Sequence, residues 1–379
     1  MKKFLFICHS SYLDDGNIFD PNYAITFGFL NYYFKDDYVV IRHSLFKNGE
    51  SRIYKNGING NYKKIYLIGV LPNVIRYIAE IIINIFYLII NKPTKIIAID
   101  PLSCFVPTLL KKIGFVEKVF FITPDFAKQR FDNKVLNKVY FLIDRFCTVN
   151  SDINICCAKT VIDYKKNIYK NLNISKKFFH LPNVPNPWII DKIKNLSKIK
   201  NRIIYVGNVS SQINFKEIFD VIFRSKEKHD DIHLIIVGKG DQEENLKRYL
   251  MENKIDNVYF LGQLAYEDTL KEIAKSEIGI ALYNGSFNYD EFRDSCKIRE
   301  YQALSTIPIT SGVVKSNTDE ILEYKSGVLL DNNTGEEIYD KIDKILSDES
   351  YKKDLHERAI KNYLIYADKY QDFYNLLKN

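Results

Sequence analysis

The sequence predicts an α/β protein made of two domains, each built around a doubly wound parallel sheet. Short runs of β-branched and aromatic residues alternate with longer amphipathic segments along the chain. Many of these runs are apolar throughout, which is typical of parallel strands that are buried on both faces. A chain of 379 residues is also too long for one hydrophobic core. We therefore expect two domains that face each other across a ligand-binding cleft.

The first half of the chain contains six strand-like runs separated by helix-like or loop segments. The earliest, KFLFIC, resembles part of a signal peptide. Its apolar run of about five residues is too short, however, and no small-residue cleavage site follows, so we interpret it as a strand. The expected strands are residues 3–8, 38–42, 64–70, 95–100, 118–123 and 153–157.

The second half repeats this scheme, which predicts a second domain of the same type. Three of its strand-like runs end in glycine, at Gly207, Gly238 and Gly262. Glycine lets the backbone turn sharply from a strand into a helix and approach a ligand closely. The expected strands are residues 202–207, 233–238, 258–262, 278–282, 307–310 and 327–330.

A proline-rich segment separates the two halves. Pro182, Pro185 and Pro187 interrupt helix and strand alike, which indicates a hinge. We therefore place an N-terminal domain at residues 1–185 and a C-terminal domain at residues 200–359. A final helix, at residues 360–379, is a candidate to pack back on the N-terminal domain.

Charge is unevenly distributed along the chain. Residues 1–190 carry 26 Lys and Arg against 14 Asp and Glu, whereas residues 191–379 carry 28 against 33. The basic half is compatible with nucleic acid, an anionic membrane surface, a phosphorylated acceptor, or a surface that only needs to be soluble. The six cysteines follow no metal-ligand spacing, which indicates reduced thiols in a cytoplasmic protein.

Residues 74–90, VIRYIAEIIINIFYLII, form the most apolar stretch of the chain. Arg76, Glu80 and Asn84 are spaced by four, so they fall on one stripe of a helix. About 17 residues is at the short limit for a membrane span. We expect a core helix of the first domain, with a membrane-dipping face as the alternative.

The stretch DSCKIREYQALSTIPITSG, residues 294–312, places cations where a helix dipole disfavours them. Ser295 or Asp294 can cap a helix that begins near Lys297, which puts Lys297 and Arg299 in the first turn. An anion at this helix end removes the conflict, because the free N–H groups, the dipole and the lysine all favour a phosphate.

Two neighbouring residues extend this interpretation to a nucleotide. Arg293 precedes the cap and is placed to join the phosphate site. Glu300 lies one turn into the helix, where its carboxylate can accept two hydrogen bonds from vicinal hydroxyls such as those of a ribose. Each residue taken alone is explained as well by a surface charge on a short helix. Their combination at a strand-to-helix edge favours a nucleotide site.

Four segments within residues 200–330 resemble, in order and spacing, the C-terminal blocks of GT-B glycosyltransferases related to retaining glycosyltransferase family 4, of the bacterial surface-polysaccharide type. They are YVGNVSSQINFKEIFDVI, HLIIVGKGDQEENLKRYL, NVYFLGQLAYEDTLKEIAKSEIGIALYN and SCKIREYQALSTIPI. The resemblance implies a GT-B fold, with two Rossmann-like domains facing a cleft. It also implies that Glu300 binds the nucleotide ribose and that Lys297 lies close to the diphosphate.

The resemblance is incomplete in the first of these blocks. The family often has an arginine and a lysine there that clamp the diphosphate, whereas this chain has Asn208, Ile213 and Asn214. Candidates to replace that clamp are Lys216, Arg293 and Arg299. Besides Glu300, we expect the nucleotide sugar to contact Arg293, Gly207, Asn208, Gly238, Lys239 and Tyr283.

The first domain is expected to bind the acceptor. His9 follows the first strand, and Asp125 follows the strand at 118–123 in a segment, residues 120–152, that resembles one in polysaccharide-cluster glycosyltransferases. Asp125 is the candidate to contact the acceptor hydroxyl or the transferred sugar, and His9 the donor sugar or the acceptor. With Lys297 they form the expected catalytic group. The surroundings of Asp125 are basic, through Lys111, Lys112, Lys118, Lys128, Arg130, Lys134 and Lys138.

The resemblance implies a hexosyltransferase-like enzyme that moves a sugar, with retention, from a nucleotide-diphosphate sugar to a saccharide or lipid-diphosphate-linked acceptor in surface-polysaccharide assembly. It implies no metal and no cofactor beyond the donor, no nucleic acid, and a cytoplasmic location with peripheral contact at the inner face of the membrane as an option. Two alternatives stay open. One is a GT-B sugar-nucleotide epimerase, and the other is a non-catalytic GT-B subunit that binds a partner or glycan.

Overall fold

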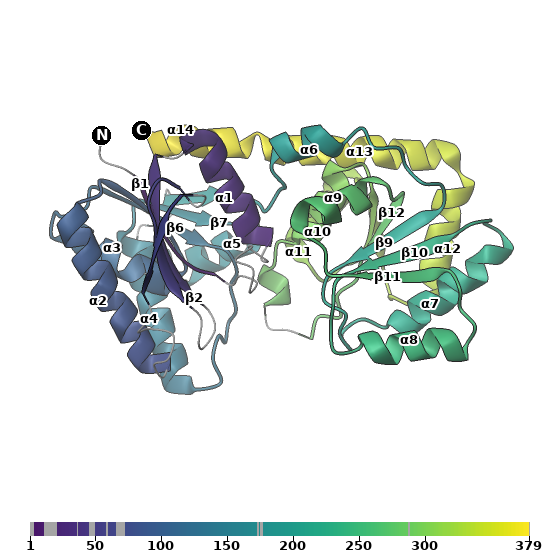
Figure 1. Ribbon diagram of the computed structural model, residues 1–379, viewed down its shortest axis with the longest axis horizontal. Helices are drawn as coiled ribbons and strands as arrows, with labels where there is room; N and C mark the ends of the chain where they lie inside the picture. The colour runs from purple at the N-terminus through teal and green to yellow at the C-terminus, as the bar shows by residue number, and fades with distance from the viewer. Residues whose placement is uncertain are drawn as a thin grey trace. The chain divides into compact units, whose positions relative to one another are not determined.

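The computed structural model describes residues 4–10, 21–35, 37–44, 50–57, 60–65, 73–172, 174, 177–286 and 289–378. The chain divides into two compact units, Met1–Pro182 and Asn183–Asn379. We call them unit 1 and unit 2. Each has its own sheet and its own hydrophobic core (Figure 1).

Unit 1 contains an eight-stranded sheet in the order β4-β3-β2-β1-β5-β6-β7-β8. The strands β2, β1, β5, β6, β7 and β8 pair in parallel, whereas β3 pairs antiparallel with both β2 and β4 at one edge. The bounds are β1 Phe4–Ser10, β2 Tyr38–Ser44, β3 Ser51–Tyr54, β4 Tyr62–Ile65, β5 Lys95–Ile99, β6 Lys118–Thr123, β7 Ile153–Cys156 and β8 Phe178–His180.

Five of the six strands expected in the first half are present. The sixth, at 64–70, overlaps β4 at its first two residues, and residues 66–70 lie outside the described part of the chain. Sequence patterning missed β3 and β8, because runs of three or four residues carry too little periodicity to separate strand from loop. The strand order reverses between β1 and β5, so the carboxyl ends of these two neighbours form the switch point of the sheet.

The helices of unit 1 lie on the two faces of this sheet. On one face, α3 packs on β1, β5 and β6 and touches both α2 and α4, so these three helices form one layer (Figure 1). The helices are α1 Pro21–Phe34, α2 Asn73–Asn91, α3 Pro101–Lys112, α4 Lys134–Asn150 and α5 Lys159–Ile168, with a short 3-10 turn at Lys170–Leu172.

Helix α2 forms where the apolar stretch predicted a helix, but it is not an ordinary core helix. Its polar residues Arg76, Glu80 and Asn84 are buried. Leu88 belongs to the core of unit 1, whereas Ile78 and Phe86 are exposed at 52% and 63%. Among the described residues we find no helix whose length and apolarity suffice to cross a bilayer.

Unit 2 contains a six-stranded parallel sheet in the order β11-β10-β9-β12-β13-β14. The order reverses between β9 and β12. Ligands of open α/β sheets bind at such a reversal, because the two following loops leave in opposite directions and open a crevice between them. The bounds are β9 Arg202–Val206, β10 His233–Val237, β11 Val258–Gly262, β12 Ile278–Ala281, β13 Ile307–Ser311 and β14 Val328–Leu330, at the positions expected from the sequence.

Helices cover both faces of this second sheet. Helix α7 packs with α8 and α12, whereas α10 packs against α9, α13, β12 and β13. The helices are α6 Pro187–Ile193, α7 Phe215–Arg224, α8 Glu243–Glu252, α9 Tyr266–Ala274, α10 Cys296–Ala303, α11 Lys315–Tyr324, α12 Gly335–Ser347, α13 Glu349–Ala367 and α14 Lys369–Lys378, with 3-10 turns at Ser225–Glu227 and Asp290–Phe292.

Two glycines bring the loops after β9 and β10 into backbone contact. Gly207 and Gly238 adopt φ values of 143° and 139°. A Cβ atom on Gly238 would lie 1.9 Å from the Gly207 carbonyl oxygen, so only glycine fits there. The Gly207 amide donates to the Val237 carbonyl at 2.9 Å. The backbone is therefore bare at Gly207, which borders the crevice between β9 and β12.

Candidate functional site

Helix α10 begins at Cys296, with Ser295 at the N-cap position, but no side chain caps it. The Ser295 hydroxyl lies 2.6 Å from the Tyr283 hydroxyl, and the Asp294 carboxylate accepts from the Asn183 backbone amide at 2.6 Å. The expected capping bond from Ser295 or Asp294 was therefore wrong, because both side chains are engaged elsewhere.

Arg299 is part of the buried framework of unit 2. Its guanidinium is 1% exposed and contacts both Asp294 oxygens, at 2.7–3.1 Å. On its other side it lies 2.9 Å from Glu320 of α11. Two carboxylates already neutralise this cation, so the proposal that Arg299 replaces the missing diphosphate clamp was wrong. The ion pairs instead hold the start of α10 against the rest of the unit.

Lys297 contrasts with Arg299, although both belong to the same helix. Within the described part of the chain its ammonium has no hydrogen bond and no ion pair. It lies over the rings of Tyr205 and Tyr283, 4.7 and 5.4 Å from their centroids, and beside Gly207. Burial, followed by the Arg293 charge, lowers the pKa of Lys297 to about 8. An anion bound at this point would stabilise the cation and raise that pKa.

Glu300 follows Lys297 by three residues and is nearly buried, at 3% exposure. Burial raises the pKa of its carboxyl to about 7, and the nearby Tyr266 hydroxyl and Lys297 ammonium only partly oppose this. Among the described residues, Glu300 Oε1 has no hydrogen bond of good geometry, and the nearby Tyr266 hydroxyl makes only a loose contact with the carboxyl. Buried polar atoms are normally paired, so a carboxylate oxygen held only by this loose contact is one that a ligand hydroxyl can pair with.

A pocket of about 340 Å³ opens at the switch point between β9 and β12. Five residues expected from the sequence line it: Gly207, Asn208, Tyr283, Arg293 and Lys297. The sequence did not point to its other lining residues, which include Tyr205, Ser210, Gln212, Asn284, Tyr289 and Asp290. Tyr205 could have been found, because it precedes Gly207 by two residues and so faces the same side of β9.

The remaining expected residues of unit 2 lie outside this lining. Glu300 lies on the same helix as Lys297, one turn further on, and Gly238 and Lys239 belong to the adjacent loop after β10. Arg293 stands at the pocket rim, paired with Asp290 at 3.2 Å and stacked 5.0 Å from the Tyr283 ring centroid. The structure thus gathers two cations, Lys297 and Arg293, around one pocket.

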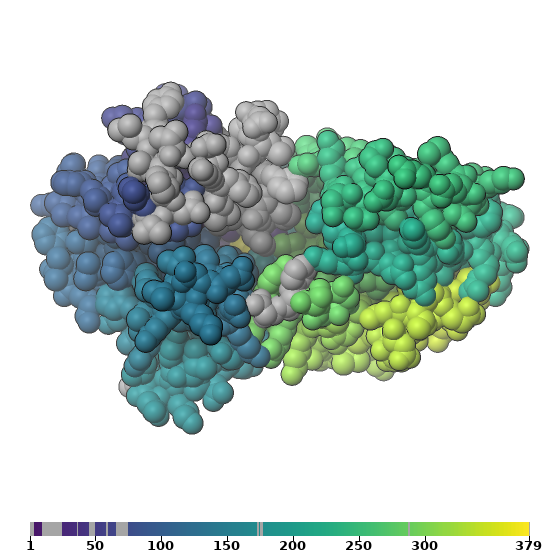
Figure 2. Space-filling model, turned by 90° about the horizontal axis from the view of Figure 1, so that it is seen from below, coloured from purple at the N-terminus to yellow at the C-terminus, as the bar shows by residue number. Residues whose placement is uncertain are grey.

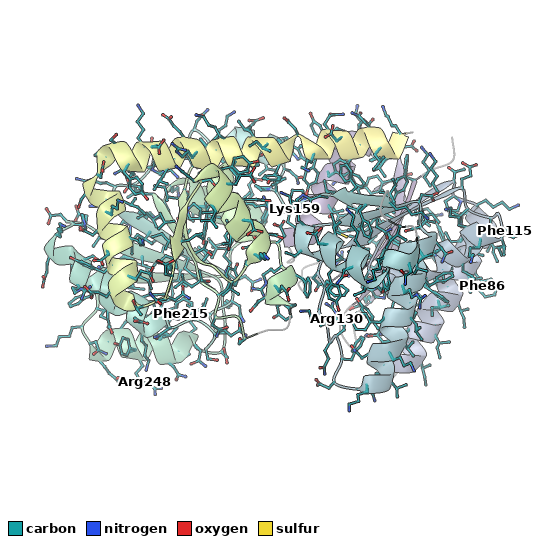
Figure 3. All side chains as sticks on the ribbon, turned by 180° about the vertical axis from the view of Figure 1, so that it is seen from behind. Phe86, Phe115, Arg130, Lys159, Phe215 and Arg248 are labelled. Atoms are coloured by element: carbon teal, nitrogen blue, oxygen red, sulfur yellow. The ribbon has the colours of Figure 1, made fainter. Side chains whose placement is uncertain are left out.

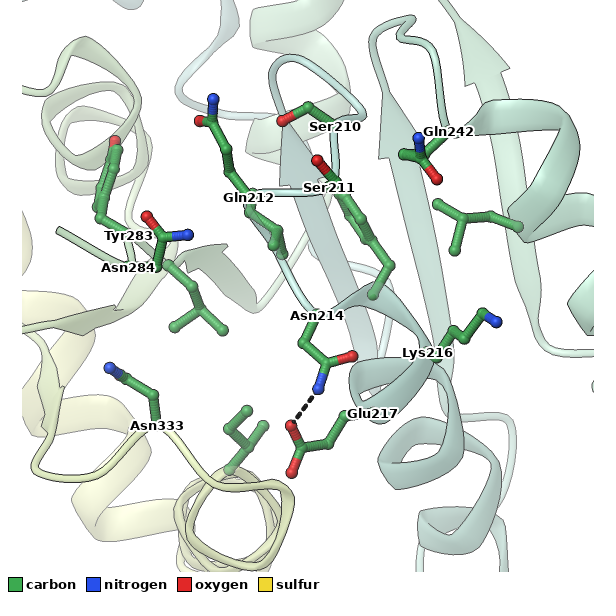
Figure 4. A pocket seen from close by; sticks show the side chains of 15 residues that line it. Ser210, Ser211, Gln212, Asn214, Lys216, Glu217, Gln242, Tyr283, Asn284 and Asn333 are labelled. Carbon is green, nitrogen blue, oxygen red and sulfur yellow. Dashed lines mark hydrogen bonds between the residues drawn. The ribbon is translucent and has the colours of Figure 1, made fainter. Parts of the chain in front are cut away.

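A second pocket, of about 400 Å³, shares Ser210, Gln212, Tyr283 and Asn284 with the first (Figure 4). Its other polar lining residues are Ser211, Asn214, Lys216, Glu217, Gln242 and Asn333. The Asn214 amide donates to Glu217 at 2.8 Å, and Lys216 lies 4.9 Å from the Tyr249 ring centroid. Most of these polar side chains are hydroxyls and amides, which can both donate and accept hydrogen bonds. Such a lining suits a ligand rich in hydroxyls.

In unit 1, His9 lies at the end of β1 and Asp100 at the end of the neighbouring strand β5, at the switch point of that sheet. His9 Nδ1 lies 2.8 Å from Asp100 and 3.0 Å from Ser103, and Nε2 lies 3.0 Å from Glu80 of α2. Although burial alone would lower it, the Asp100 and Glu80 carboxylates raise the pKa of His9 to about 10. His9 is thus an imidazolium with both nitrogens engaged, which suits positioning better than proton abstraction.

Asp100 was not among the residues expected from the sequence. It caps α3 by accepting from the Ser103 amide at 2.9 Å, with a strained backbone at φ 73° and ψ 159°. Burial opposes ionisation, but the His9 imidazolium holds the pKa of Asp100 below its usual range. Such strain is common at functional sites. The signal available in the sequence was an aspartate followed by Pro101, the usual start of a helix.

Asp125 lies two residues after β6, and its partner Arg130 also interacts electrostatically with Asp100 of the His9 cluster. Its side chain is 53% exposed and pairs with Arg130 at 2.8 Å. Its negative charge is therefore partly neutralised by Arg130. His9 and Asp125 belong to unit 1, whereas the other expected site residues belong to unit 2.

The sequence of unit 2 is similar to that of known glycosyltransferases. Residues 186–362 match the family described as "Glycosyl transferases group 1". Over 177 residues the chain is 25% identical to MJ1069, an uncharacterized glycosyltransferase of Methanocaldococcus jannaschii. This match spans 46% of the chain and 43% of that protein, so the chain covers less than half of the relative's length.

Three solved structures are similar over the whole chain. The lipopolysaccharide outer core galactosyltransferase WaaB in its apo form matches 100% of both chains, with a TM-score of 0.64 and 15% identity. Sucrose-phosphate synthase from Thermosynechococcus elongatus matches 99% of both chains, with a TM-score of 0.65 and 13% identity. A trehalose-6-phosphate structure from E. coli bound with UDP-2-fluoro glucose matches 100% of this chain and 99% of that one, with a TM-score of 0.66 and 12% identity. The chain therefore has the GT-B fold.

The buried ion pairs of Arg299 predict that Arg299→Ala destabilises the protein strongly. The change leaves Asp294 and Glu320 buried without their cation, which costs about 3–5 kcal/mol. Urea unfolding measures this. The matched control, Arg248→Ala, removes an exposed arginine of α8 (Figure 3) and should change the stability by less than about 0.5 kcal/mol. Equal stability of the two variants would contradict a framework role for Arg299.

The raised pKa of Glu300 predicts a specific pH dependence of stability. A carboxyl with a higher pKa in the folded state takes up protons on folding, so its contribution to the free energy of unfolding falls as pH rises from about 4.5 to about 7. Glu300→Gln replaces it with a neutral group of the same shape and should remove this fall. At pH 8 the variant should therefore melt at a higher temperature than the parent. A lower melting temperature at pH 8 would refute the expectation.

Proposed function

We propose that this protein is a glycosyltransferase that moves a sugar from a nucleotide-diphosphate sugar to a saccharide acceptor. The observation that carries the proposal is the pocket at the switch point of unit 2, which is lined by Lys297, a cation with no hydrogen bond or ion pair among the described residues, and by Arg293. The match of residues 186–362 to the glycosyl transferases supports it independently. The E. coli structure with bound UDP-2-fluoro glucose, to which the chain is similar, supports the same class of donor.

The donor is proposed to bind with its diphosphate at Lys297 and its ribose at Glu300. The glycine at 207 leaves the backbone bare beside the Lys297 ammonium, so a phosphate can contact both. Arg293 at the rim supplies a second cation, in place of the Arg and Lys that are absent at Asn208 and Asn214. A carboxylate at Glu300 can accept from both ribose hydroxyls.

Transfer is proposed to proceed with retention and without a metal ion, with a hexose as the transferred sugar. As the bond to the sugar breaks, negative charge grows on the leaving nucleoside diphosphate, and Lys297 and Arg293 stabilise it. The donor phosphate is proposed to accept the proton of the acceptor hydroxyl, so the role of the protein is positioning and charge stabilisation. Neither step requires a nucleophilic side chain.

The acceptor is proposed to be a saccharide, or a saccharide linked to a lipid diphosphate, in the assembly of a surface polysaccharide. One structural relative is named as a galactosyltransferase of the lipopolysaccharide outer core, which supports this class. In unit 1, Asp100 and Asp125 lie after the carboxyl ends of β5 and β6, where an acceptor hydroxyl can be bound. We place the protein in the cytoplasm, at the inner face of the membrane.

A non-catalytic GT-B subunit is the second candidate, because the positions of the usual diphosphate clamp hold Asn208, Ile213 and Asn214. Incubation with nucleotide sugars, with and without saccharide acceptors, separates the possibilities. A transferase releases nucleoside diphosphate only when an acceptor is present, an epimerase converts the donor alone, and a binding subunit does neither.

Removal of the Glu300 carboxylate should weaken donor binding. Glu300→Ala should cost roughly 1.5–3 kcal/mol of binding free energy, because charge-assisted hydrogen bonds to the ribose are lost. Titration calorimetry with nucleoside diphosphates and nucleotide sugars measures this. Glu252→Ala, at an exposed carboxylate on α8, is the control and should bind as the parent does. Unchanged donor affinity of Glu300→Ala would remove Glu300 from the site.

Lys297→Met should lower turnover by about a hundredfold and change the Michaelis constant of the donor less, because the charge on the leaving diphosphate grows in the transition state. Methionine keeps the length of the side chain and its contact with Tyr205. Steady-state kinetics of sugar transfer measure both constants, with Lys353→Met, at an exposed lysine of α13, as the control. Equal turnover of Lys297→Met and the parent would contradict this role.

A further inference from the structure

Helix α2 packs one apolar side on the core, through Ile81, Ile85 and Leu88, but it also buries polar residues and exposes a second apolar side. The residues that it buries include Arg76, Glu80 and Asn84, whereas its most exposed positions are apolar. On a surface helix of a globular protein the apolar stripe normally faces the core. The exposed apolar residues of α2 recur every three or four positions and so form one stripe: Ile75, Ile78, Ile82, Phe86, Ile89 and Ile90.

Contacts with the strands hold α2 in this orientation. Glu80 binds His9 Nε2 at 3.0 Å, and the Asn84 side-chain oxygen lies 3.2 Å from His43 Nε2. Rotation of the helix to bury Ile78 and Ile82 would break both contacts and leave the His9 imidazolium without one of its two carboxylates. The exposed apolar stripe is thus a consequence of a buried polar cluster that the fold needs.

The neighbouring helices continue this surface. At the end of α3, Ile113 and Phe115 are exposed and line a pocket together with Lys92, which follows α2, and with Glu117. Phe86 and Phe115 both lie on the outer side of unit 1 in Figure 3. In Figure 2 residues of α2 appear in dark blue and those of α4 in lighter blue on the surface of unit 1. Helix α4 adds the exposed residues Val135, Leu136, Val139 and Leu142.

The exposed charges within these three helices have one sign, and Glu117, in the loop after α3, is an exposed carboxylate beside them. The carboxylates within α2, α3 and α4 are Glu80 and Asp144, and both are buried and paired, with His9 and Lys165. The exposed charged side chains of the three helices are therefore cationic: Lys112, Lys134, Lys138 and Arg145. An apolar stripe bordered by lysine and arginine is the pattern of a helix that lies in the surface of an anionic membrane.

We propose that this surface, formed by the exposed residues of α2, α3 and α4 named above and called here the α2–α4 face, docks on a membrane that contains anionic phospholipid. The apolar side chains enter the boundary between headgroups and acyl chains, and the cations contact the lipid phosphates. A second copy of this chain fits less well, because two cationic faces would repel each other. The inference deepens the proposed function, since a lipid-linked acceptor would be met at this surface, but it is tested without sugar transfer.

Co-sedimentation with vesicles tests the docking. The protein should bind vesicles of zwitterionic lipid mixed with anionic phosphatidylglycerol at low salt, and bind at least about tenfold less to vesicles of zwitterionic lipid alone. High salt should weaken binding to the anionic vesicles, because it screens the cations. Equal binding to both vesicle types, or no binding to the anionic vesicles at low salt, would overturn the proposal.

Variants locate the contact. Ile82→Glu with Phe86→Glu, and separately Lys134→Glu with Lys138→Glu, should each reduce binding to anionic vesicles at least about tenfold. The matched controls lie in unit 2 at residues of similar exposure: Leu322→Glu with Leu364→Glu, and Lys353→Glu with Lys361→Glu. They should bind as the parent does. Equal loss in test and control variants would show a general charge effect and overturn the assignment to the α2–α4 face.

Two further measurements separate other outcomes. Light scattering of the parent should show the same mass as the Ile82→Glu, Phe86→Glu variant. If the parent is a dimer and the variant is a monomer, the membrane proposal is overturned, and the face instead binds a second copy of this chain. All variants should keep the melting temperature and the nucleotide affinity of the parent, because the α2–α4 face lies in unit 1 and the pocket in unit 2. Failure of the proposed donor site would therefore be seen in calorimetry and not in sedimentation.

Discussion

The ion pairs of Arg299 are the contact on which the candidate site depends. They connect α10 to Glu320 of α11 and, through Asp294, to the chain at Asn183. With Asp294 drawn to Arg299, and Ser295 to Tyr283, no side chain caps α10. The start of this helix, with Lys297 in its first turn, is therefore left open at the crevice between β9 and β12. One short segment therefore supplies both the buried ion pairs, through Asp294 and Arg299, and the lining of the pocket, through Arg293 and Lys297.

The two units use the same edge of the sheet differently. In unit 2 the helix at the switch point carries Lys297, which has no ion pair among the described residues, and Glu300, and burial displaces the pKa values of both toward neutrality. In unit 1 the switch point carries His9 between two carboxylates, which is a neutralised arrangement. Unpaired buried charge is costly without a ligand. This contrast agrees with the proposal that the pocket of unit 2 binds a charged donor.

The polar cluster of unit 1 also determines its outer surface. Because Glu80 and Asn84 face His9 and His43, the stripe of α2 that contains Ile78, Ile82 and Phe86 is turned outward. A helix in isolation would be expected to turn its apolar stripe inward. The polar contacts inside unit 1 thus explain why α2 exposes apolar side chains. The proposal that this surface docks on a membrane starts from that orientation.

The sequence alone determined the fold class, the position of most strands and the segment that carries Lys297 and Glu300, because strand periodicity and loop motifs are local properties. It left the partners of each charge undecided. Lys297 and Arg299 look alike in the sequence. Only the fold brings Glu320 to Arg299 and places Lys297 at the pocket. Helix α2 was likewise predicted as a helix, but which of its faces is buried depended on His9 and His43, which lie more than 30 residues away in the chain. The short strands β3 and β8 and Asp100 were missed for a related reason. Pairing and burial are decided between distant segments, and only the tertiary structure brings those segments together.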